Sequence, residues 1–187
     1  MYRLVALLLV PLVTLGGTRG PTDPERSALR PAPDLAGTYV LDRKASDDPR
    51  RAVDQALTSM RRFKRNAIKK RLDDGMKPAD TLHVRTSGDT VAITTSGRMR
   101  LTTVPGGEAR TLTGQNGRSM QIASGWEGSA LVVRMTSASF RRETRYALDD
   151  ANARLRVEVT TTAERLAQPI HYTLVYDRVA SDTTASP

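Results

Sequence analysis

Residues 80–101 read DTLHVRTSGDTVAITTSGRMRL, and this stretch predicts the fold. Apolar Leu82 and Val84 alternate with polar neighbours, which is the pattern of a β-strand with one buried face. Ser87-Gly88-Asp89 then favours a tight turn, and a second alternating run begins at Val91. Because the connection between the two runs is so short, the strands that they form must be antiparallel.

The same rhythm of strands and turns fills most of the chain. About ten strand candidates lie in residues 34–179, with turn residues roughly every eight to twelve positions. A meander of this kind must hide its edge strands, and closure into a barrel is the common solution. We therefore expect a mainly β protein, folded as an antiparallel up-and-down barrel of about 8–10 strands.

One long amphipathic helix is predicted after the first strand, over about residues 47–74. Asp47 and Asp48 can accept hydrogen bonds at its start, Pro49 suits its first turn, and Gly75 and Pro78 end it. Spacings of three and four place one group of apolar side chains on a single face: Val53, Ala56, Leu57, Met60, Phe63 and Ala67.

The positive charge of the chain is concentrated in this helix. The formal net charge is +9, and residues 50–72 hold nine Lys or Arg against the single acid Asp54. Three interpretations stay open: a solvated face, a patch that meets anionic lipid headgroups, or a surface for a protein partner. With few aromatics and no basic surface elsewhere, nucleic-acid binding is not expected. The candidate patch comprises Arg61, Arg62, Lys64, Arg65, Lys69 and Lys70.

The ends of the chain have compositions unlike that of the middle. Residues 1–18 are predicted to be a signal peptide, because Arg3 precedes an apolar run that ends in small residues. Residues 19–33 are predicted to be a disordered leader, and residues 180–187 a disordered tail. Export to a bacterial periplasm or cell exterior follows as an expectation. The sequence has no cysteine, which excludes disulfides, thiol catalysis and thiolate metal sites.

Gly37-Thr38-Tyr39 and Arg178 carry a resemblance to the calycin group, which includes the lipocalins, the fatty-acid-binding proteins and their exported bacterial relatives. Lipocalins open their first strand with Gly-x-Trp and pack a late Arg over that Trp. Here Tyr39 stands in its place, and the resemblance implies a cation–π contact with Arg178. Fatty-acid-binding proteins insert a pair of short helices after the first strand, whereas a single helix is expected here. The resemblance implies a barrel that holds a small apolar ligand.

The strand that runs from Phe140 to Tyr146 contains the candidate ligand-binding residues. Alternation places Phe140, Arg142, Thr144 and Tyr146 on one face of it. If that face points into the barrel, Arg142 needs a counter-charge or an anionic ligand, and a fatty-acid carboxylate would serve. Two alternatives remain open: an ion pair with Glu158, or a place at the barrel rim in contact with water.

Other residues with chemical potential have ordinary structural interpretations. His83 and His171 are predicted to face solvent, and Trp126 to anchor a turn. Three acidic pairs, at residues 47–48, 73–74 and 149–150, fall at helix ends or in a turn. Neither a catalytic nor a metal-binding motif is present.

The sequence therefore predicts an exported, non-enzymatic, lipocalin-like protein without a cofactor or metal, which binds a small apolar or anionic amphiphilic ligand. The alternative is a filled barrel that acts as an interaction module, with its basic helix docked on an anionic membrane or a protein partner.

Overall fold

The computed structural model describes residues 33–96, 100–113, 119–149 and 151–179. These residues all belong to one compact unit, residues 32–187. The predicted signal peptide, the leader up to residue 32 and the predicted tail at 180–187 lie outside the described residues.

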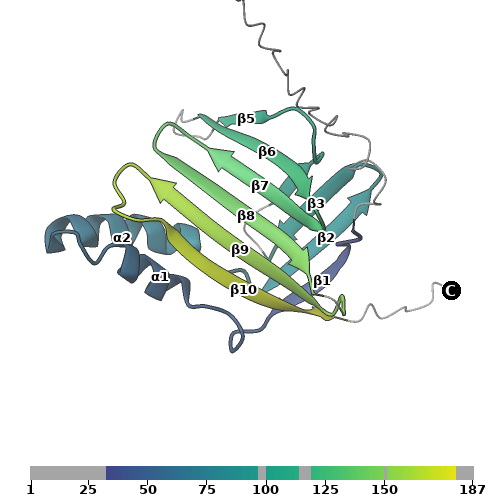
Figure 1. The fold of residues 1–187 in the computed structure, drawn as a ribbon, viewed down its shortest axis with the longest axis horizontal. Coiled ribbons are helices and arrows are strands. Elements are labelled where there is room, and N and C mark those ends of the chain that lie inside the picture. Colours follow the sequence, from purple (N-terminus) through teal and green to yellow (C-terminus); the bar gives the residue numbers. More distant parts are fainter. Residues whose placement is uncertain (1–32, 97–99, 114–118, 150, 180–187) are drawn as a thin grey trace, which may run out of the picture. The chain divides into compact units, whose positions relative to one another are not determined.

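Ten antiparallel strands of the described residues form a single sheet (Figure 1). Their order across the sheet is β4-β3-β2-β1-β10-β9-β8-β7-β6-β5. This architecture confirms the predicted mainly β fold and its number of strands. The strands are β1 (Gly37–Leu41), β2 (Thr81–Ser87), β3 (Thr90–Thr95), β4 (Arg100–Thr103), β5 (Arg110–Thr113), β6 (Ser119–Glu127), β7 (Ala130–Thr136), β8 (Phe140–Leu148), β9 (Arg154–Ala163) and β10 (Ile170–Val179).

The sheet curls into a half-barrel, and its hydrogen-bonded ladder stays open between β4 and β5. The first strand pairs with the last, with Thr38 opposite Val179, but β4 and β5 occupy the two ends of the described ladder. In the described residues the barrel is therefore a half-barrel, without a hydrogen-bonded pair of β4 and β5 to close it. Every residue of β5 is exposed. The connection after β4 instead bonds to β6, where the Gly106 amide donates to the Ser124 carbonyl at 2.8 Å.

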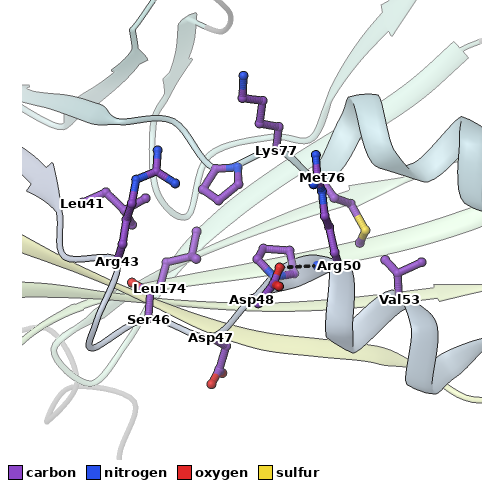
Figure 2. A pocket seen from close by; sticks show the side chains of 12 residues that line it. Leu41, Arg43, Ser46, Asp47, Asp48, Arg50, Val53, Met76, Lys77 and Leu174 are labelled. Atoms are coloured by element: carbon purple, nitrogen blue, oxygen red, sulfur yellow. Dashed lines mark hydrogen bonds between the residues drawn. The ribbon is translucent and has the colours of Figure 1, made fainter.

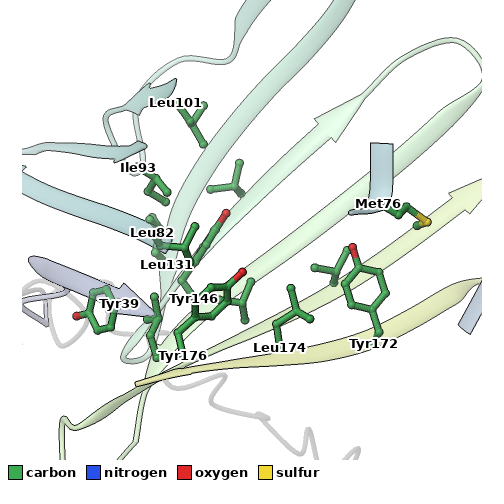
Figure 3. Close-up of a cluster of buried hydrophobic side chains, with 14 of the residues drawn as sticks. Tyr39, Met76, Leu82, Ile93, Leu101, Leu131, Tyr146, Tyr172, Leu174 and Tyr176 are labelled. Carbon is green, nitrogen blue, oxygen red and sulfur yellow. The ribbon is translucent and has the colours of Figure 1, made fainter. Parts of the chain in front are cut away.

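Inward-facing side chains of almost all the strands form one hydrophobic core. Tyr39, Leu131, Leu155 and Ile170 are completely inaccessible to solvent. Figure 3 shows the tyrosines of β8 and β10 projecting to the same side of the sheet as the aliphatic residues. This burial follows the alternation along each strand, because successive side chains point to opposite faces.

The first and last strands are joined by the contact that the resemblance implied. The Arg178 guanidinium carbon lies 5.7 Å from the centroid of the Tyr39 ring, and the Tyr39 hydroxyl donates to the Leu35 carbonyl at 2.9 Å. Arg178 also donates to the carbonyl of Ala36. Gly37 leaves room for this contact, since a Cβ there would lie only 3.0 Å from Arg178 Nε.

Two helices, rather than one, follow β1: α1 (Pro49–Ala56) and α2 (Arg62–Met76). The prediction of a single helix over about residues 47–74 is wrong. Asp48 caps α1 as expected, accepting from the Arg50 amide at 2.9 Å. The break comes after Leu57, where the Thr58 hydroxyl bonds back to the Asp54 carbonyl at 3.0 Å. Hydroxyl side chains of this kind compete with the helical backbone for its hydrogen bonds.

The break also divides the predicted apolar face of the helix. Val53, Ala56 and Leu57 are buried, and α1 packs against β10. Phe63, expected on the same buried face, is 88% exposed because α2 begins with a new orientation after the break. An ion pair of 2.5 Å between Lys69 and Asp54 holds α2 to α1. Within the described part of the chain, no helix is long and apolar enough to cross a bilayer.

Candidate ligand-binding site

A cavity of about 240 Å³ lies between the inner face of the sheet and the segment that follows α2. Most of its walls are apolar, and a few polar groups of β3, β8 and β10 interrupt them. This combination is typical of sites for small organic ligands. The lining residues are Met76, Lys77, Pro78, Ala79, Leu82, Thr95, Val133, Met135, Arg142, Thr144, Tyr146, Val157, Val159, Tyr172, Leu174 and Tyr176.

Arg142 enters this cavity, on the face that alternation predicted. Its guanidinium donates to the Tyr172 hydroxyl at 3.3 Å. Among the described residues, no carboxylate oxygen comes within 4.0 Å of the Arg142 nitrogens. Glu158, the alternative partner, instead accepts from Arg156 at 2.9 Å on the outer face. The cavity therefore contains a positive charge without an ionic partner in the described structure.

A polar group beside Arg142, the Thr161 hydroxyl, has no hydrogen-bond partner in the described structure. Thr161 lies directly opposite Arg142 in the pairing of β8 with β9, and its side chain is 7% exposed. Its hydroxyl oxygen is buried and makes no hydrogen bond in the described structure. A buried hydroxyl without a partner costs free energy, which a ligand or an ordered water would recover.

Tyrosine hydroxyls supply the other polar groups of the cavity. Burial raises the pKa of Tyr146 to about 12, although the charge of Arg142 partly opposes the effect. Burial also raises the pKa of Tyr172, again against the influence of Arg142. Both phenols therefore stay protonated at neutral pH. Because the Tyr172 oxygen accepts from Arg142, its own hydrogen remains free to donate to an anion.

The structure brings together three of the four predicted ligand-binding residues. Arg142, Thr144 and Tyr146 line the cavity, whereas Phe140 is half-buried at the start of β8 and does not line it. Sequence reasoning missed Tyr172 as a site residue. The signal for it was a hydroxyl at an inward-facing position of the alternating last strand, a place usually taken by an apolar side chain.

The predicted basic patch divides into exposed and engaged residues. Arg61, Arg62 and Lys64 are exposed around the first turn of α2. Arg65 is half-buried, with its guanidinium donating to the Met60 carbonyl at 3.2 Å, and Lys69 forms the ion pair with Asp54. The Lys70 side chain lies outside the described part of the structure.

The remaining candidates take structural positions. His83 and His171 are exposed as predicted and lie within hydrogen-bonding distance of threonine hydroxyls on neighbouring strands. Asp149 accepts from the Ala153 amide at 2.9 Å within its turn. Trp126 packs half-buried against the core at the end of β6. In the described ranges, no group of three metal-binding side chains is close enough to hold an ion.

Because Tyr146 is buried, we expect the folded domain to lose stability at alkaline pH. An unfolded tyrosine ionises near pH 10, whereas Tyr146 in the fold ionises near pH 12. Its contribution is therefore complete below pH 10 and is lost as the pH rises to 12, by about 2 kcal/mol. We expect a Tyr146→Phe variant to lose less stability than the native protein over this range in urea unfolding experiments. Equal losses of stability in the two proteins over this pH range would contradict the raised pKa of Tyr146.

Comparison with known proteins supports the fold and goes no further. No family model matches the sequence, and no curated protein is significantly similar to it. The solved structure titled "REP1-NXSQ fatty acid transporter" superposes with a TM-score of 0.50 at 16% identity, over 79% of this chain and 97% of the other. Human cRBP IV gives 0.51 at 18% identity, over 79% of this chain and 99% of the other. At such identities the likeness is one of fold alone.

Proposed function

We propose that this chain is an exported, non-enzymatic protein that binds a small anionic amphiphile inside its half-barrel. The observation that carries the proposal is the Arg142 guanidinium, which faces an apolar cavity and has no carboxylate within 4.0 Å in the described structure. Arg142 and Tyr172 would hold the anionic group, and the aliphatic walls would surround the apolar part.

The energetics of a partly desolvated cation favour this assignment. A charge that is removed from water without a partner costs free energy, and the cost is recovered when a carboxylate binds it. Planar guanidinium groups suit carboxylates well, and a charge-assisted hydrogen bond is about twice as strong as a neutral one. The neutral Tyr172 hydroxyl provides a second donor. A fatty acid has the required combination of one carboxylate and an apolar chain.

Two further observations support the proposal. One of the proteins with a similar fold is titled a fatty acid transporter. The apolar run in residues 1–18 supports export, which N-terminal sequencing of the protein from a periplasmic fraction would test.

Native mass spectrometry of the delipidated protein tests ligand binding directly. With dodecanoic acid, we expect a one-to-one complex that dissociates on collisional activation. The matched control is 1-dodecanol, which has the same chain without the charge and should bind more weakly. Equal binding of both would show that the charge has no role, and binding of neither would overturn the proposal.

A second candidate function rests on the exposed Phe63. This side chain stands between Arg62 and Lys64, which are also exposed, on the first turn of α2. An apolar group surrounded by cations suits the interface of an anionic membrane, where its ring would enter the headgroup region. We propose membrane docking by this turn as the alternative role of the chain.

Charge neutralisation distinguishes this docking from general attraction. Each basic residue near an anionic surface contributes about 1 kcal/mol, so Arg62→Gln/Lys64→Gln should weaken binding to phosphatidylglycerol vesicles roughly 30-fold. Cosedimentation measures the change. Arg85→Gln/Arg110→Gln is the matched control, since both residues are exposed on strands and the lost charge is the same. Equal losses in the two double variants would rule out docking through α2.

A further inference from the structure

A second hollow, of about 420 Å³, adjoins the ligand cavity at the start of α1. Figure 2 shows it between the loop that precedes α1, the helix itself and the segment after α2. We call this hollow the α1 cleft. Met76, Lys77, Pro78 and Leu174 line both the α1 cleft and the cavity, so the two spaces share a wall.

The α1 cleft combines an apolar floor with cationic groups. Leu41, Pro49 and Val53 provide apolar surface. The Arg50 side chain extends toward Met76 in Figure 2, whereas the side chain of Lys77, which also lines the cleft, is directed away from α1. These two cations are exposed, and no carboxylate of the described residues lies within 4.0 Å of either one.

The other charged groups of the α1 cleft are engaged. Arg43 forms an ion pair with Asp80. Asp47 accepts from the Thr173 amide at 2.7 Å, and Asp48 accepts from the Arg50 amide at 2.9 Å. Figure 2 shows Asp47 directed away from Met76 and Lys77. The cations available to a ligand are therefore Arg50, which lines the α1 cleft alone, and Lys77, which belongs to the wall that the two spaces share.

The volume of the inner cavity also favours a ligand that extends into the α1 cleft. Ligand pockets usually measure about 300–1,000 Å³, so a cavity of about 240 Å³ is small for an amphiphile with a long chain. Met76 and Leu174 line both spaces, so a ligand that reaches from Arg142 into the α1 cleft would run along these two apolar side chains. With both compartments filled, the available space falls within the usual range.

We propose that the α1 cleft is the second half of one elongated ligand site, and that it receives a second anionic group at the far end of the ligand. The proposal rests on the function proposed above, because it requires the first anionic group to lie on Arg142. The favoured ligand class is then a long-chain amphiphile with an acidic group at each end, such as a long-chain dicarboxylic acid. A monocarboxylic acid would place a methyl group beside Arg50 and Lys77 and gain nothing from their charges.

Isothermal titration with hexadecanedioic acid and hexadecanoic acid tests the inference. We expect Arg50→Gln/Lys77→Gln to weaken binding of the diacid about fivefold or more, and binding of the monoacid by less than twofold. Lys44→Gln/Arg85→Gln is the matched control, because both residues are exposed and neither lines the α1 cleft. This control should leave both affinities unchanged.

The outcomes separate this inference from the proposed function. If the native protein binds both acids and the Arg50→Gln/Lys77→Gln variant binds them with unchanged affinity, the cleft inference alone is overturned. An equal loss for both acids in that variant also overturns it, since the effect would then be general attraction of anions. If the native protein binds neither acid, the proposed function fails and this inference fails with it.

Discussion

Replacing Tyr39 by alanine is expected to destabilise the domain by about 3–5 kcal/mol, which is the usual cost of truncating a buried aromatic residue. The Tyr39 side chain is fully buried, and its ring supports the Arg178 guanidinium at 5.7 Å. Its removal leaves a cavity and loses the ring contact with Arg178 that joins β1 to β10. Urea unfolding followed by circular dichroism measures the loss.

A phenylalanine at the same position is the matched control. Tyr39→Phe keeps the ring and loses only the hydrogen bond from the hydroxyl to the Leu35 carbonyl, so about 1 kcal/mol should be lost. A loss below about 1 kcal/mol in the alanine variant would show that the ring is not a central part of the core.

Replacing Arg142 by leucine should abolish most ligand affinity without harming the fold. Removal of a charge-assisted hydrogen bond costs about 1.5–3 kcal/mol, so binding of dodecanoic acid should weaken by roughly 10- to 150-fold. The free energy of unfolding without ligand should stay the same or increase, because leucine removes a charge that has no partner in the described structure. Isothermal titration measures the affinity, and urea unfolding of the same samples measures the free energy of unfolding.

The neighbouring arginine provides the control for Arg142. Arg141 is exposed on the outer face of β8, so Arg141→Leu should leave the affinity unchanged. Equal losses in the two variants would indicate a general effect of charge on an anionic ligand. An unchanged affinity in Arg142→Leu would remove the anchor on which the proposed function depends.

Most of the sheet could be predicted from the sequence, because alternation and turn residues are local signals. Leu82 and Val84 face the core as the pattern indicated, and the turn at Gly88 has the positive φ of 54° that glycine adopts readily. The open edge at β5 was not predictable in the same way. Whether a strand finds a neighbour depends on residues far away in the chain, and alternation carries no information about them.

The helical region shows where periodicity alone misleads. Leu57, Met60 and Phe63 keep spacings of three across the break, so the apolar stripe reads as continuous. The structure stops α1 at Ala56 and turns the chain before α2 begins. The turn residues Thr58 and Ser59 were the local signal for this break.

The candidate site was predictable only in part, since it is built by packing. Alternation placed Arg142 with Thr144 and Tyr146, but the absence of a nearby carboxylate became visible only in three dimensions. Tyr172 lies 30 positions from Arg142, and no local pattern connects them. The α1 cleft unites segments from β1, α1 and the linker after α2, so it has no sequence signature at all.

The pairing of β1 with β10 determines when the domain can finish folding during synthesis. Val179 is the partner of Thr38, so a nascent chain cannot complete its sheet until almost the whole domain has left the ribosome. Contacts between residues so distant in sequence also make folding slow. Until then, the apolar faces of the early strands stay exposed and attract chaperones. A chain that remains unfolded for this long is suited to post-translational passage through a membrane, which is one route for the proposed export.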